Sequence, residues 1–443
     1  MLLTSPMVGT FATSEYSRSM RKRKRYRHFD SRTSHMISSQ FICCQIGARE
    51  HYSIPRAAYQ QGVLRYFFTD VWVKPGDVIA NLPFSWTRRY KERFHSDLET
   101  ATVFNFSQRL LTAELASRLR TMSPWQKTIA RNQWFQKRVV RKLKQLEISD
   151  AEEICVFAYS YAAREILAYA RSRGWTTVLG QIDPGPVEEK IVEKLQARYR
   201  HQYLSVWEPA PKQYWHEWKK ECELADRIVV NSKWSAHSLI AAGVAAEKIS
   251  TVPLIYSPSQ AAVQTKRRFP SQFSADRPLR VLFLGQAILR KGIAETIQAA
   301  QLLVNQPVEF IIVGNPEFSI SSELLAVSNI KWIGPVPRSK VAFYYQQADV
   351  FLFPTWSDGF GLTQLEAQAW KLPLISSQNC GEVVEDGFNG LLLSEISGNA
   401  IAFAIRQVLA SPEKLASFSA NSVAMDQFSP EKLCHFFDTT NRR

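Results

Sequence analysis

Residues 349–370, DVFLFPTWSDGFGLTQLEAQAW, contain a strand, a glycine-rich turn and a helix in immediate succession. The apolar run VFLF is short and is ended by Pro354, which is typical of a buried strand. Gly359 and Gly361 bracket the turn, where the backbone can take a positive φ and let a ligand approach closely. We expect a helix from Leu362 onward.

Two carboxylates, Asp358 and Glu366, lie in this unit. Glu366 falls at helical spacing with the apolar residues Leu362, Leu365 and Ala369, so it is expected on the inward face of the helix. A buried carboxylate is costly unless something binds it, and the free N–H groups at a helix start suit a phosphate. The pattern indicates a pocket with amides for a phosphate and a carboxylate for hydroxyls. The alternative is a structural pair between Glu366 and a Lys or Arg.

The same alternation of strands and helices extends through the chain. In the second half, strands are expected at Val281–Leu284, Phe310–Val313, Ile330–Ile333, Val350–Phe353 and Pro373–Ser376. In the first half they are expected at Gln40–Ile46, Leu64–Thr69, Thr102–Phe106, Cys155–Tyr159, Thr177–Ile182 and Arg227–Val230. This order predicts an α/β fold with two parallel, doubly wound sheets, in which ligands bind at the carboxyl ends of the strands.

The 443 residues are enough for two domains with large cores. We predict a basic disordered tail at residues 1–38, an N-terminal domain at 39–265 and a C-terminal domain at 266–424. The polar, proline-marked stretch Ser257–Pro278 is expected to join the domains. A terminal helix is predicted at 425–443, with Ser429 as its N-cap.

The formal net charge of +15 lies in two segments, residues 1–40 and residues 118–146. The first has no apolar period and precedes no recognisable nucleic-acid module, so nucleic acid is not an expected partner. Translation from Met36 would remove most of it. The second includes Trp125–Glu147, a basic amphipathic helix. It can lie on an anionic membrane surface, or pack on its own domain with a solvated basic face.

The remaining composition suggests a cytoplasmic protein, with peripheral membrane attachment through residues 125–147 as an option. No apolar run approaches the ~18 residues of a spanning helix, and the N-terminus is a poor signal peptide. The six cysteines are scattered without metal-type spacing, so reduced, buried thiols are expected, with no metal and no cofactor.

A second polar group follows the first strand of the C-terminal half, in VLFLGQAILRKGIAE at Val281–Glu295. Arg290 and Lys291 precede Gly292, where the next helix is expected to begin. Two cations at a helix start are well placed for a diphosphate, although a basic pair in a loop is often solvated surface.

These residues resemble glycosyltransferase family 4 of the GT-B fold. The family's E-G-F-G-L-x-x-L-E-A motif reads Asp358-Gly-Phe-Gly-Leu-Thr-Gln-Leu-Glu366-Ala367 here. Further likenesses are Gly285–Gly292 to G-R-x-x-x-x-K-G, Gly381–Val384 to G-x-x-E-V-V, Asp386–Gly390 to D-G-x-x-G and, weakly, Ala225–Ser232 to the strand ending the N-terminal domain. The resemblance is close over residues 279–393.

The resemblance implies a retaining, hexosyltransferase-type enzyme that moves a sugar from a nucleotide-sugar donor without a bound metal. It implies that Glu366 binds the ribose, Asp358 contacts the donor sugar hydroxyls and Lys291 neutralises the leaving diphosphate. Donor-binding roles also fall on Gly285, Gln286, Gly359, Phe360, Gly361 and Leu362. It further implies a C-terminal helix that returns to the N-terminal domain.

The sequence departs from the family pattern in four motifs. Asp358 replaces Glu, Gln286 replaces Arg, and Asp183 stands where many members carry His. Pro253-Leu254-Ile255 replaces P-N-G. Arg290 is expected to supply the charge that Gln286 lacks. Asp358 and Gln286 support the alternative function, a catalytically inactive GT-B binding or scaffold protein.

The acceptor is not identified by these motifs; we expect a polysaccharide or a lipid-linked intermediate. The loop after the first strand is expected to face the cleft with Gly47, Arg49, Glu50 and His51. Asp183, after a strand, is expected to meet donor or acceptor hydroxyls. The tryptophan-rich runs Trp125–Trp134 and Trp207–Trp218 can stack on sugars, rest against lipid or lie in the core.

Overall fold

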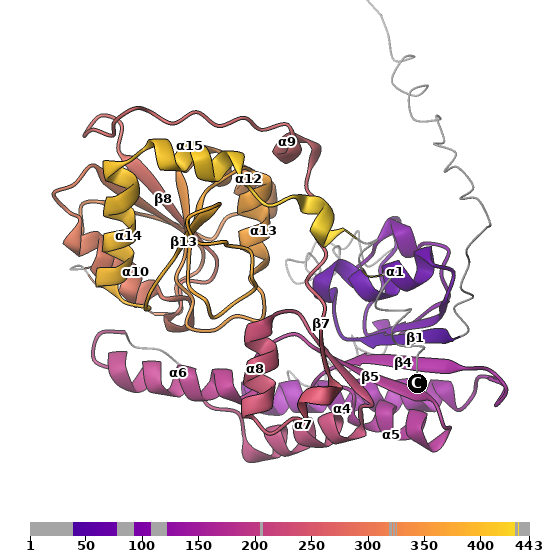
Figure 1. Cartoon of the computed structure of the whole chain (residues 1–443). Coiled ribbons are helices and arrows are strands. Elements are labelled where there is room, and N and C mark those ends of the chain that lie inside the picture. The colour runs from indigo at the N-terminus through magenta and orange to yellow at the C-terminus, as the bar shows by residue number, and fades with distance from the viewer. Residues whose placement is uncertain are drawn as a thin grey trace, which may run out of the picture. The chain divides into compact units, whose positions relative to one another are not determined.

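Two parallel sheets organise the computed structural model (Figure 1). The first has seven strands in the order β3-β2-β1-β4-β5-β6-β7, and the second has six in the order β10-β9-β8-β11-β12-β13. The first comprises β1 (Gln40–Gln45), β2 (Leu64–Thr69), β3 (Val103–Asn105), β4 (Ile154–Tyr159), β5 (Thr176–Gln181), β6 (Arg227–Val230) and β7 (Ile249–Thr251). The second comprises β8 (Leu279–Leu284), β9 (Val308–Val313), β10 (Ile330–Gly334), β11 (Val350–Phe353), β12 (Leu374–Ser376) and β13 (Gly390–Leu392). The predicted α/β fold with two doubly wound sheets is confirmed.

The structure describes residues 39–77, 93–107, 122–203, 207–318, 321, 324, 326–429 and 433. They all belong to one compact unit, Ser38–Arg443. We call each sheet with its packed helices a lobe. The predicted tail at residues 1–38 lies outside the described residues, and so does the predicted terminal helix beyond Ser429, apart from Leu433.

Each predicted strand is present, but β7 and β13 were not predicted. Both are three-residue strands, too short for an alternating pattern to be recognised. β13 begins at Gly390, where a Cβ atom would lie 2.3 Å from the carbonyl oxygen of Leu374 on the neighbouring strand. The pairing of β13 with its neighbouring strand therefore depends on the close approach of the backbones at Gly390 and Leu374, and not on an alternating apolar pattern.

Helices cover both faces of each sheet. In the second lobe, α10 (Ile293–Leu302) and α14 (Gly398–Ala410) pack on one face, and α12 (Arg338–Gln347) and α13 (Leu362–Ala369) on the other (Figure 1). In the first lobe, α4 (Pro124–Leu143), α5 (Arg164–Ser172) and α7 (Lys212–Leu224) share one core cluster with the strands. The other α-helices in the described part of the chain are α1 (Ser53–Gln60), α6 (Pro186–Tyr199), α8 (Lys233–Ala241), α9 (Gln260–Val263) and α15 (Glu413–Ala420).

The basic amphipathic helix is α4, and its apolar stripe is used within the lobe. Phe135, Val139 and Leu143 are buried in the first lobe's core. A capping box between Ser123 and Gln126 starts the helix. An apolar face packed against a sheet is not available to enter a lipid surface, so α4 packs as the docking alternative predicts. In the part of the chain that the structure describes, no helix has both the length and the apolarity needed to cross a membrane.

Helix α6 links the lobes, because it follows β5 of the first sheet but packs on the core of the second lobe. Leu195 and Tyr199 are buried there, and Tyr199 donates a hydrogen bond to Glu295 of α10 at 2.7 Å. Figure 1 shows α6 running along the second lobe. Helix α6 is thus connected to the first sheet but forms part of the second lobe's core.

The segment predicted to join the domains is docked rather than free. Arg267 is mostly buried and donates hydrogen bonds to the carbonyl oxygens of Trp370 at 2.7 Å, Ala348 at 2.6 Å and Tyr345. These carbonyls end α12 and α13, where a cation is favourable. Burial lowers the pKa of Arg267 to about 10, so the side chain stays charged at neutral pH.

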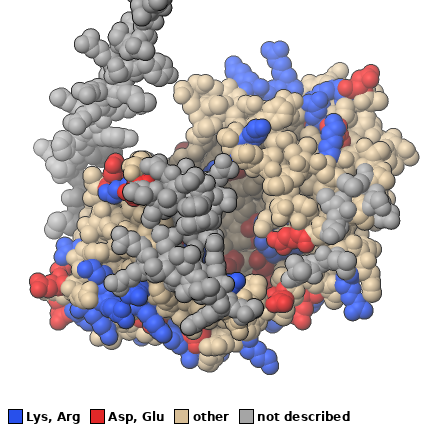
Figure 2. Space-filling model, turned by 180° about the vertical axis from the view of Figure 1, so that it is seen from behind, with Lys and Arg blue, Asp and Glu red and all other residues tan. Residues whose placement is uncertain are grey.

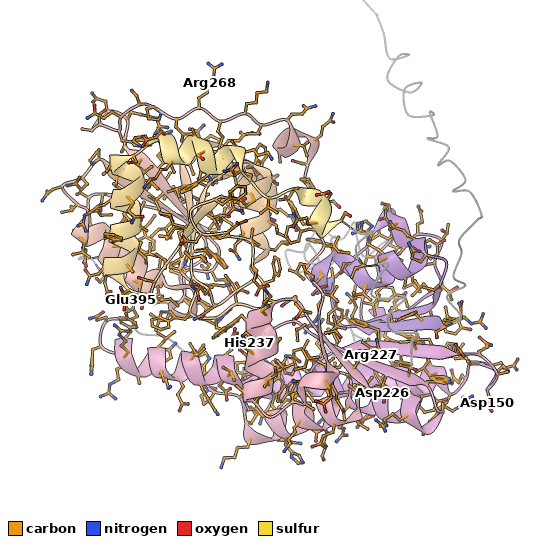
Figure 3. The ribbon with its side chains drawn as sticks, viewed as in Figure 1. Asp150, Asp226, Arg227, His237, Arg268 and Glu395 are labelled. Atoms are coloured by element: carbon orange, nitrogen blue, oxygen red, sulfur yellow. The ribbon has the colours of Figure 1, made fainter. Side chains whose placement is uncertain are left out.

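We predict that Arg267→Met lowers the free energy of unfolding by about 2–4 kcal/mol, since it leaves three buried carbonyls without their charged donor. The measurement is urea denaturation followed by circular dichroism. Arg268→Met is the matched control, because the neighbouring arginine is exposed and points away from the lobe (Figure 3). Equal midpoints for the two variants would contradict this role.

Candidate functional site

The central pair of strands in the second sheet marks the place where a ligand is expected. β8 is the first strand of this sheet and lies between β9 and β11. The chain therefore leaves β8 in one direction and later returns on its other side, which makes a topological switch point. The loop after β8 begins at Gly285, and the loop after β11 leads to Asp358.

Space as well as backbone conformation requires glycine in the turn after β11. Gly361 has φ +87°, and a Cβ atom there would lie 2.6 Å from the ring of Phe353. At Gly359 a Cβ atom would lie 1.9 Å from the carbonyl oxygen of Ile182 in the first lobe. The turn is thus pressed against both its own strand and the other lobe.

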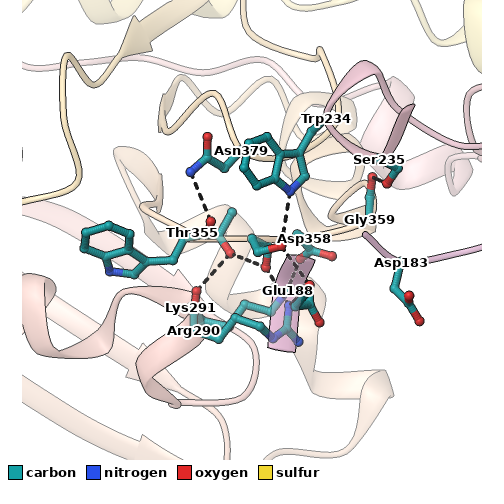
Figure 4. Close-up of polar contacts among 12 residues, drawn as sticks. Asp183, Glu188, Trp234, Ser235, Arg290, Lys291, Thr355, Asp358, Gly359 and Asn379 are labelled. Carbon is teal, nitrogen blue, oxygen red and sulfur yellow. Dashed lines mark hydrogen bonds and ion pairs between the residues drawn. The ribbon is translucent and has the colours of Figure 1, made fainter. Parts of the chain in front are cut away.

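The first lobe grips this turn through the N-terminus of α8 (Figure 4). The carbonyl oxygen of Gly359 accepts hydrogen bonds from the hydroxyls of Ser232 at 2.5 Å and Ser235 at 3.2 Å. The indole of Trp234 donates to the hydroxyl of Ser357 at 3.1 Å. Three residues of the first lobe therefore hold two residues of the second. In the sequence Ser232 is only the last residue of the strand motif Ala225–Ser232, which gave no sign of this contact.

Arg290 takes part in the same contact and does not face the expected donor site. Its guanidinium donates to the carbonyl oxygen of Ser357 at 2.6 Å and lies 3.4 Å from Glu188 of α6. The hydroxyl of Ser357 also donates to Glu188, at 2.9 Å. Burial raises the pKa of Glu188, and Arg290 opposes that rise. Arg290 thus does not replace the charge missing at Gln286.

Lys291, the next residue, forms an ion pair with Asp358, and each side chain is 17% exposed. Its ammonium lies 5.3 Å from the centroid of the Phe353 ring. Burial and the nearby Arg290 lower the pKa of Lys291 to about 7, and Glu188 opposes that fall. A carboxylate in direct contact, such as Asp358, also favours the protonated form. A cation and a carboxylate thus meet at the switch point in a setting with little water.

A cavity of about 410 Å³ opens over this pair and is lined by both lobes. The predicted site residues that line it are Arg49, Glu50, Gly285, Gln286, Lys291, Asp358, Phe360, Gly361 and Leu362. We call it the donor cavity. Figure 2 shows the protein from behind, where the surface is hollowed and acidic side chains are visible within the hollow.

Glu366 lies next to the donor cavity without lining it. One carboxylate oxygen accepts a hydrogen bond from the hydroxyl of Tyr345 at 2.8 Å, and the other lies 4.0 Å from Arg338, which is 63% exposed. Burial raises the pKa of Glu366. Leu362 and Thr363, one helical turn earlier, do line the cavity. The alternative role predicted for Glu366, a structural pair with a Lys or Arg, is matched among the described residues only by this long contact with the exposed Arg338.

The loop after β1 contributes two of its four predicted residues to the cavity. Arg49 and Glu50 line it. Glu50 accepts hydrogen bonds from Ser53 and Tyr159 at 3.0 Å each, and burial raises its pKa. Gly47 is buried and donates its N–H to Asp70 at 2.8 Å instead.

His51 is exposed and lies 3.2 Å from Arg338 of α12. Together with Glu50 it holds a positive φ, of 51° and 50° respectively. Backbone strain of this kind is often concentrated at functional loops.

Asp183 lines a different cavity, of about 230 Å³, on the other side of Arg290 and Glu188. Its carboxylate accepts hydrogen bonds from Tyr161 at 2.5 Å, from Gln181 at 2.8 Å and from the N–H of Gly185 at 2.9 Å. The strand-end position predicted a polar side chain facing a ligand site, and the structure places it at this second site.

The described residues contain no cluster of three or more His, Cys, Asp or Glu side chains arranged to hold a metal. Absence of a metal from the reaction stays a prediction. Five of the six cysteines, Cys43, Cys44, Cys155, Cys222 and Cys380, are free and buried. Cys434 lies outside the described residues.

With this geometry in place, comparison with known proteins identifies the second lobe. Residues 264–425 match the family described as "Glycosyl transferases group 1". Over these residues the second lobe is similar to group 1 glycosyltransferases. The amylovoran biosynthesis glycosyltransferase AmsK of Erwinia amylovora is 26% identical over 190 residues, which cover 40% of this chain and 45% of AmsK.

A second relative is the N,N'-diacetylbacillosaminyl-diphospho-undecaprenol alpha-1,3-N-acetylgalactosaminyltransferase of Campylobacter jejuni. It is 27% identical over 169 residues, which cover 37% of this chain and 44% of the relative. The chain thus spans less than half the length of these two curated relatives.

The fold extends beyond the matched segment. The crystal structure of Anabaena HepE in complex with UDP superimposes with a TM-score of 0.56, covering 91% of this chain and 99% of HepE at 14% identity. This likeness confirms the predicted GT-B fold with two Rossmann-like domains.

We predict that affinity for a nucleotide-sugar falls as pH rises above 7, by less than about tenfold in all, because only protonated Lys291 attracts the diphosphate and most of that attraction develops in the transition state. Below pH 7 Lys291 is charged and affinity is flat. The diphosphate of a nucleotide-sugar does not itself titrate in this range. The measurement is calorimetric titration of the donor between pH 6 and 9.

Lys291→Met provides the control, since it should bind more weakly at every pH and lose the dependence. Asp358→Asn should move the midpoint to lower pH by removing the partner that favours the charged form. A slope that survives in Lys291→Met would show that another group titrates.

Proposed function

We propose that the protein is a retaining, hexosyltransferase-type glycosyltransferase that uses a nucleotide-sugar donor. The observation that carries this is the buried Lys291–Asp358 pair at the switch point of a group 1 glycosyltransferase domain, beside the amides of a glycine turn. A cation, a carboxylate and free amides in one cavity match the diphosphate, the sugar hydroxyls and the phosphate oxygens of such a donor.

In this proposal the chain stabilises the departing diphosphate and no protein group attacks the sugar. Negative charge grows on the diphosphate as the bond to the sugar breaks. Lys291 and the amides of Phe360, Gly361 and Leu362 are preorganised to meet it, which lowers the barrier without reorganisation. The leaving diphosphate takes the acceptor's proton on the same face of the sugar, which retains the anomeric configuration. Asp358 orients the sugar hydroxyls.

Glu366 would bind the ribose hydroxyls from the cavity's margin. A half-buried carboxylate held by Tyr345 keeps one oxygen free of other buried donors, and hydroxyls would supply the missing hydrogen bonds. No metal is required in this scheme.

The proposed acceptor is a sugar of a polysaccharide or of a lipid-linked intermediate. Two observations favour this class: AmsK takes its name from amylovoran biosynthesis, and the Campylobacter relative is named for a diphospho-undecaprenol acceptor. A cytoplasmic site of action stays part of the proposal, in which the exposed basic face of α4 contacts anionic lipid headgroups.

We predict that Glu366→Ala weakens binding of the correct nucleotide-sugar by about 10–100-fold, the value of one or two charge-assisted hydrogen bonds. A thermal-shift panel of UDP-, GDP- and ADP-sugars measures it, because a ligand of the folded state raises the melting temperature. Glu395→Ala, an exposed carboxylate on the far side of the second lobe, is the control (Figure 3).

Stabilisation by one nucleotide class that is lost only in Glu366→Ala would support the assignment. Absence of stabilisation by any of the donors, with a well-folded protein, would favour the inactive binding or scaffold alternative.

We predict that Lys291→Ala lowers kcat by about 10²–10³-fold with a much smaller change in KM, because the charge it meets develops in the transition state. Release of the nucleoside diphosphate in the presence of acceptor gives both constants, and NMR of the first-formed product gives its anomeric configuration. A change confined to KM, or an inverted product, would contradict the mechanism.

A further inference from the structure

A second cavity, of about 230 Å³, has no part in the donor site described above. Its walls come from α6 and α7, from the first turn of α4, and from residues that follow β8 and β9. It therefore lies between the lobes, as the donor cavity does. The two tryptophan-rich runs of the sequence meet here, because Trp125, Trp207 and Trp215 all line it.

The aromatic walls are held rigidly. The rings of Tyr161 and Tyr214 stack with centroids 4.9 Å apart and planes at 18°. Trp125 and Trp215 meet Tyr214 edge to face, at 5.0 Å and 5.2 Å. The indole nitrogens donate to the carbonyl oxygen of Glu208 at 3.1 Å and to Glu189 at 2.7 Å. Such rings present flat apolar surfaces at little further cost in conformational entropy.

The polar lining is acidic. Among the described residues, four carboxylates, Asp183, Glu188, Glu189 and Glu317, line the cavity together with one cation, Arg290. One oxygen of Asp183 accepts three hydrogen bonds, while no described residue donates to the other. That oxygen is placed to accept from a ligand hydroxyl.

Two pairs of consecutive residues connect this cavity to the donor cavity. Ile182 lines the donor cavity and the next residue, Asp183, lines the second cavity. Likewise Lys291 lines the donor cavity and the residue before it, Arg290, lines the second cavity. Consecutive Cα atoms are only about 3.8 Å apart, so the two cavities share a thin wall. A molecule in the second cavity would extend a reactive group toward the donor over a short distance.

We propose that this second cavity binds an uncharged saccharide of the acceptor, an inference that rests on the proposed function. The apolar C–H face of a sugar ring packs on the aromatic walls, and its hydroxyls donate to Asp183 and the neighbouring carboxylates. A phosphate or an acidic sugar meets an excess of carboxylates and is rejected. In a lipid-linked acceptor the diphosphate would then lie outside this cavity.

The test is direct binding of methyl glycosides of glucose, galactose, mannose and N-acetylglucosamine. It is read by saturation-transfer NMR and by tryptophan fluorescence, with and without the nucleotide that stabilises the protein. Methyl glucuronide is the matched anionic probe for methyl glucoside. The variants are Tyr214→Ala, which removes a stacking face, and Asp183→Asn, which keeps the shape and removes the charge. Tyr59→Ala on α1 is the aromatic control away from both cavities.

At least one uncharged glycoside should bind to the wild-type protein. Its affinity should be at least tenfold lower in Tyr214→Ala and in Asp183→Asn, and unchanged in Tyr59→Ala. Methyl glucuronide should bind at least tenfold more weakly than methyl glucoside. Nucleotide affinity should be the same in all variants, which shows that they are folded and that the donor cavity is intact.

Three results would overturn the proposal: a protein that binds nucleotide but no uncharged glycoside, glycoside binding that neither cavity variant weakens, or equal binding of the glucuronide. A protein that binds glycoside with this pattern but no nucleotide would instead count against the proposed glycosyl transfer.

Discussion

The buried carbonyl of Gly359 is the point on which the arrangement of this site depends. A carbonyl removed from water needs hydrogen-bond donors, and two serine hydroxyls at the N-terminus of α8 supply them from the other lobe. The donors can reach it only because Gly359 has no side chain, since a Cβ would collide with the carbonyl of Ile182. This grip fixes the residue before it, Asp358, beside Lys291. It also fixes Ser357 against Glu188, and so forms the wall between the two cavities.

The neighbouring cations Arg290 and Lys291 line different cavities, one on each side of this wall. The guanidinium of Arg290 is committed to a carbonyl and a carboxylate, so its charge is satisfied within the protein. The ammonium of Lys291 faces the donor cavity, where burial weakens its hold on a proton. An anion that enters the cavity would stabilise the protonated, charged form of Lys291. In the proposed function, the cost of burying Lys291 would favour a ligand of high negative charge in this cavity.

The lobes are joined by more than the turn. Helix α6 leaves the first sheet and buries Leu195 and Tyr199 against the second lobe's core, while Arg267 of the connecting segment caps two of its helices. One end of α6 presents Glu188 to Ser357 and the other presents Tyr199 to Glu295. The helix that supports the aromatic cavity is thus also part of the structure that holds the donor loop in place.

Local sequence was enough for the fold and for the donor loop. Short apolar runs ended by glycine or proline mark strands whatever lies around them, and Gly359 and Gly361, which follow Asp358, indicate a turn before a helix. The two sheets, α13 and the placement of Lys291 and Asp358 in strand-end loops were therefore predictable. The direction in which a side chain faces could not be predicted from the local sequence. Arg290 and Lys291 are adjacent in sequence and identical in sign, yet they line different cavities. Asp183, Glu188, Ser232 and Trp125 carried no sign of their partners, because those partners are far away in the chain. The tertiary structure decided these contacts, since burial and hydrogen bonding between distant segments depend on how two sheets are brought together and not on the spacing of residues along either one.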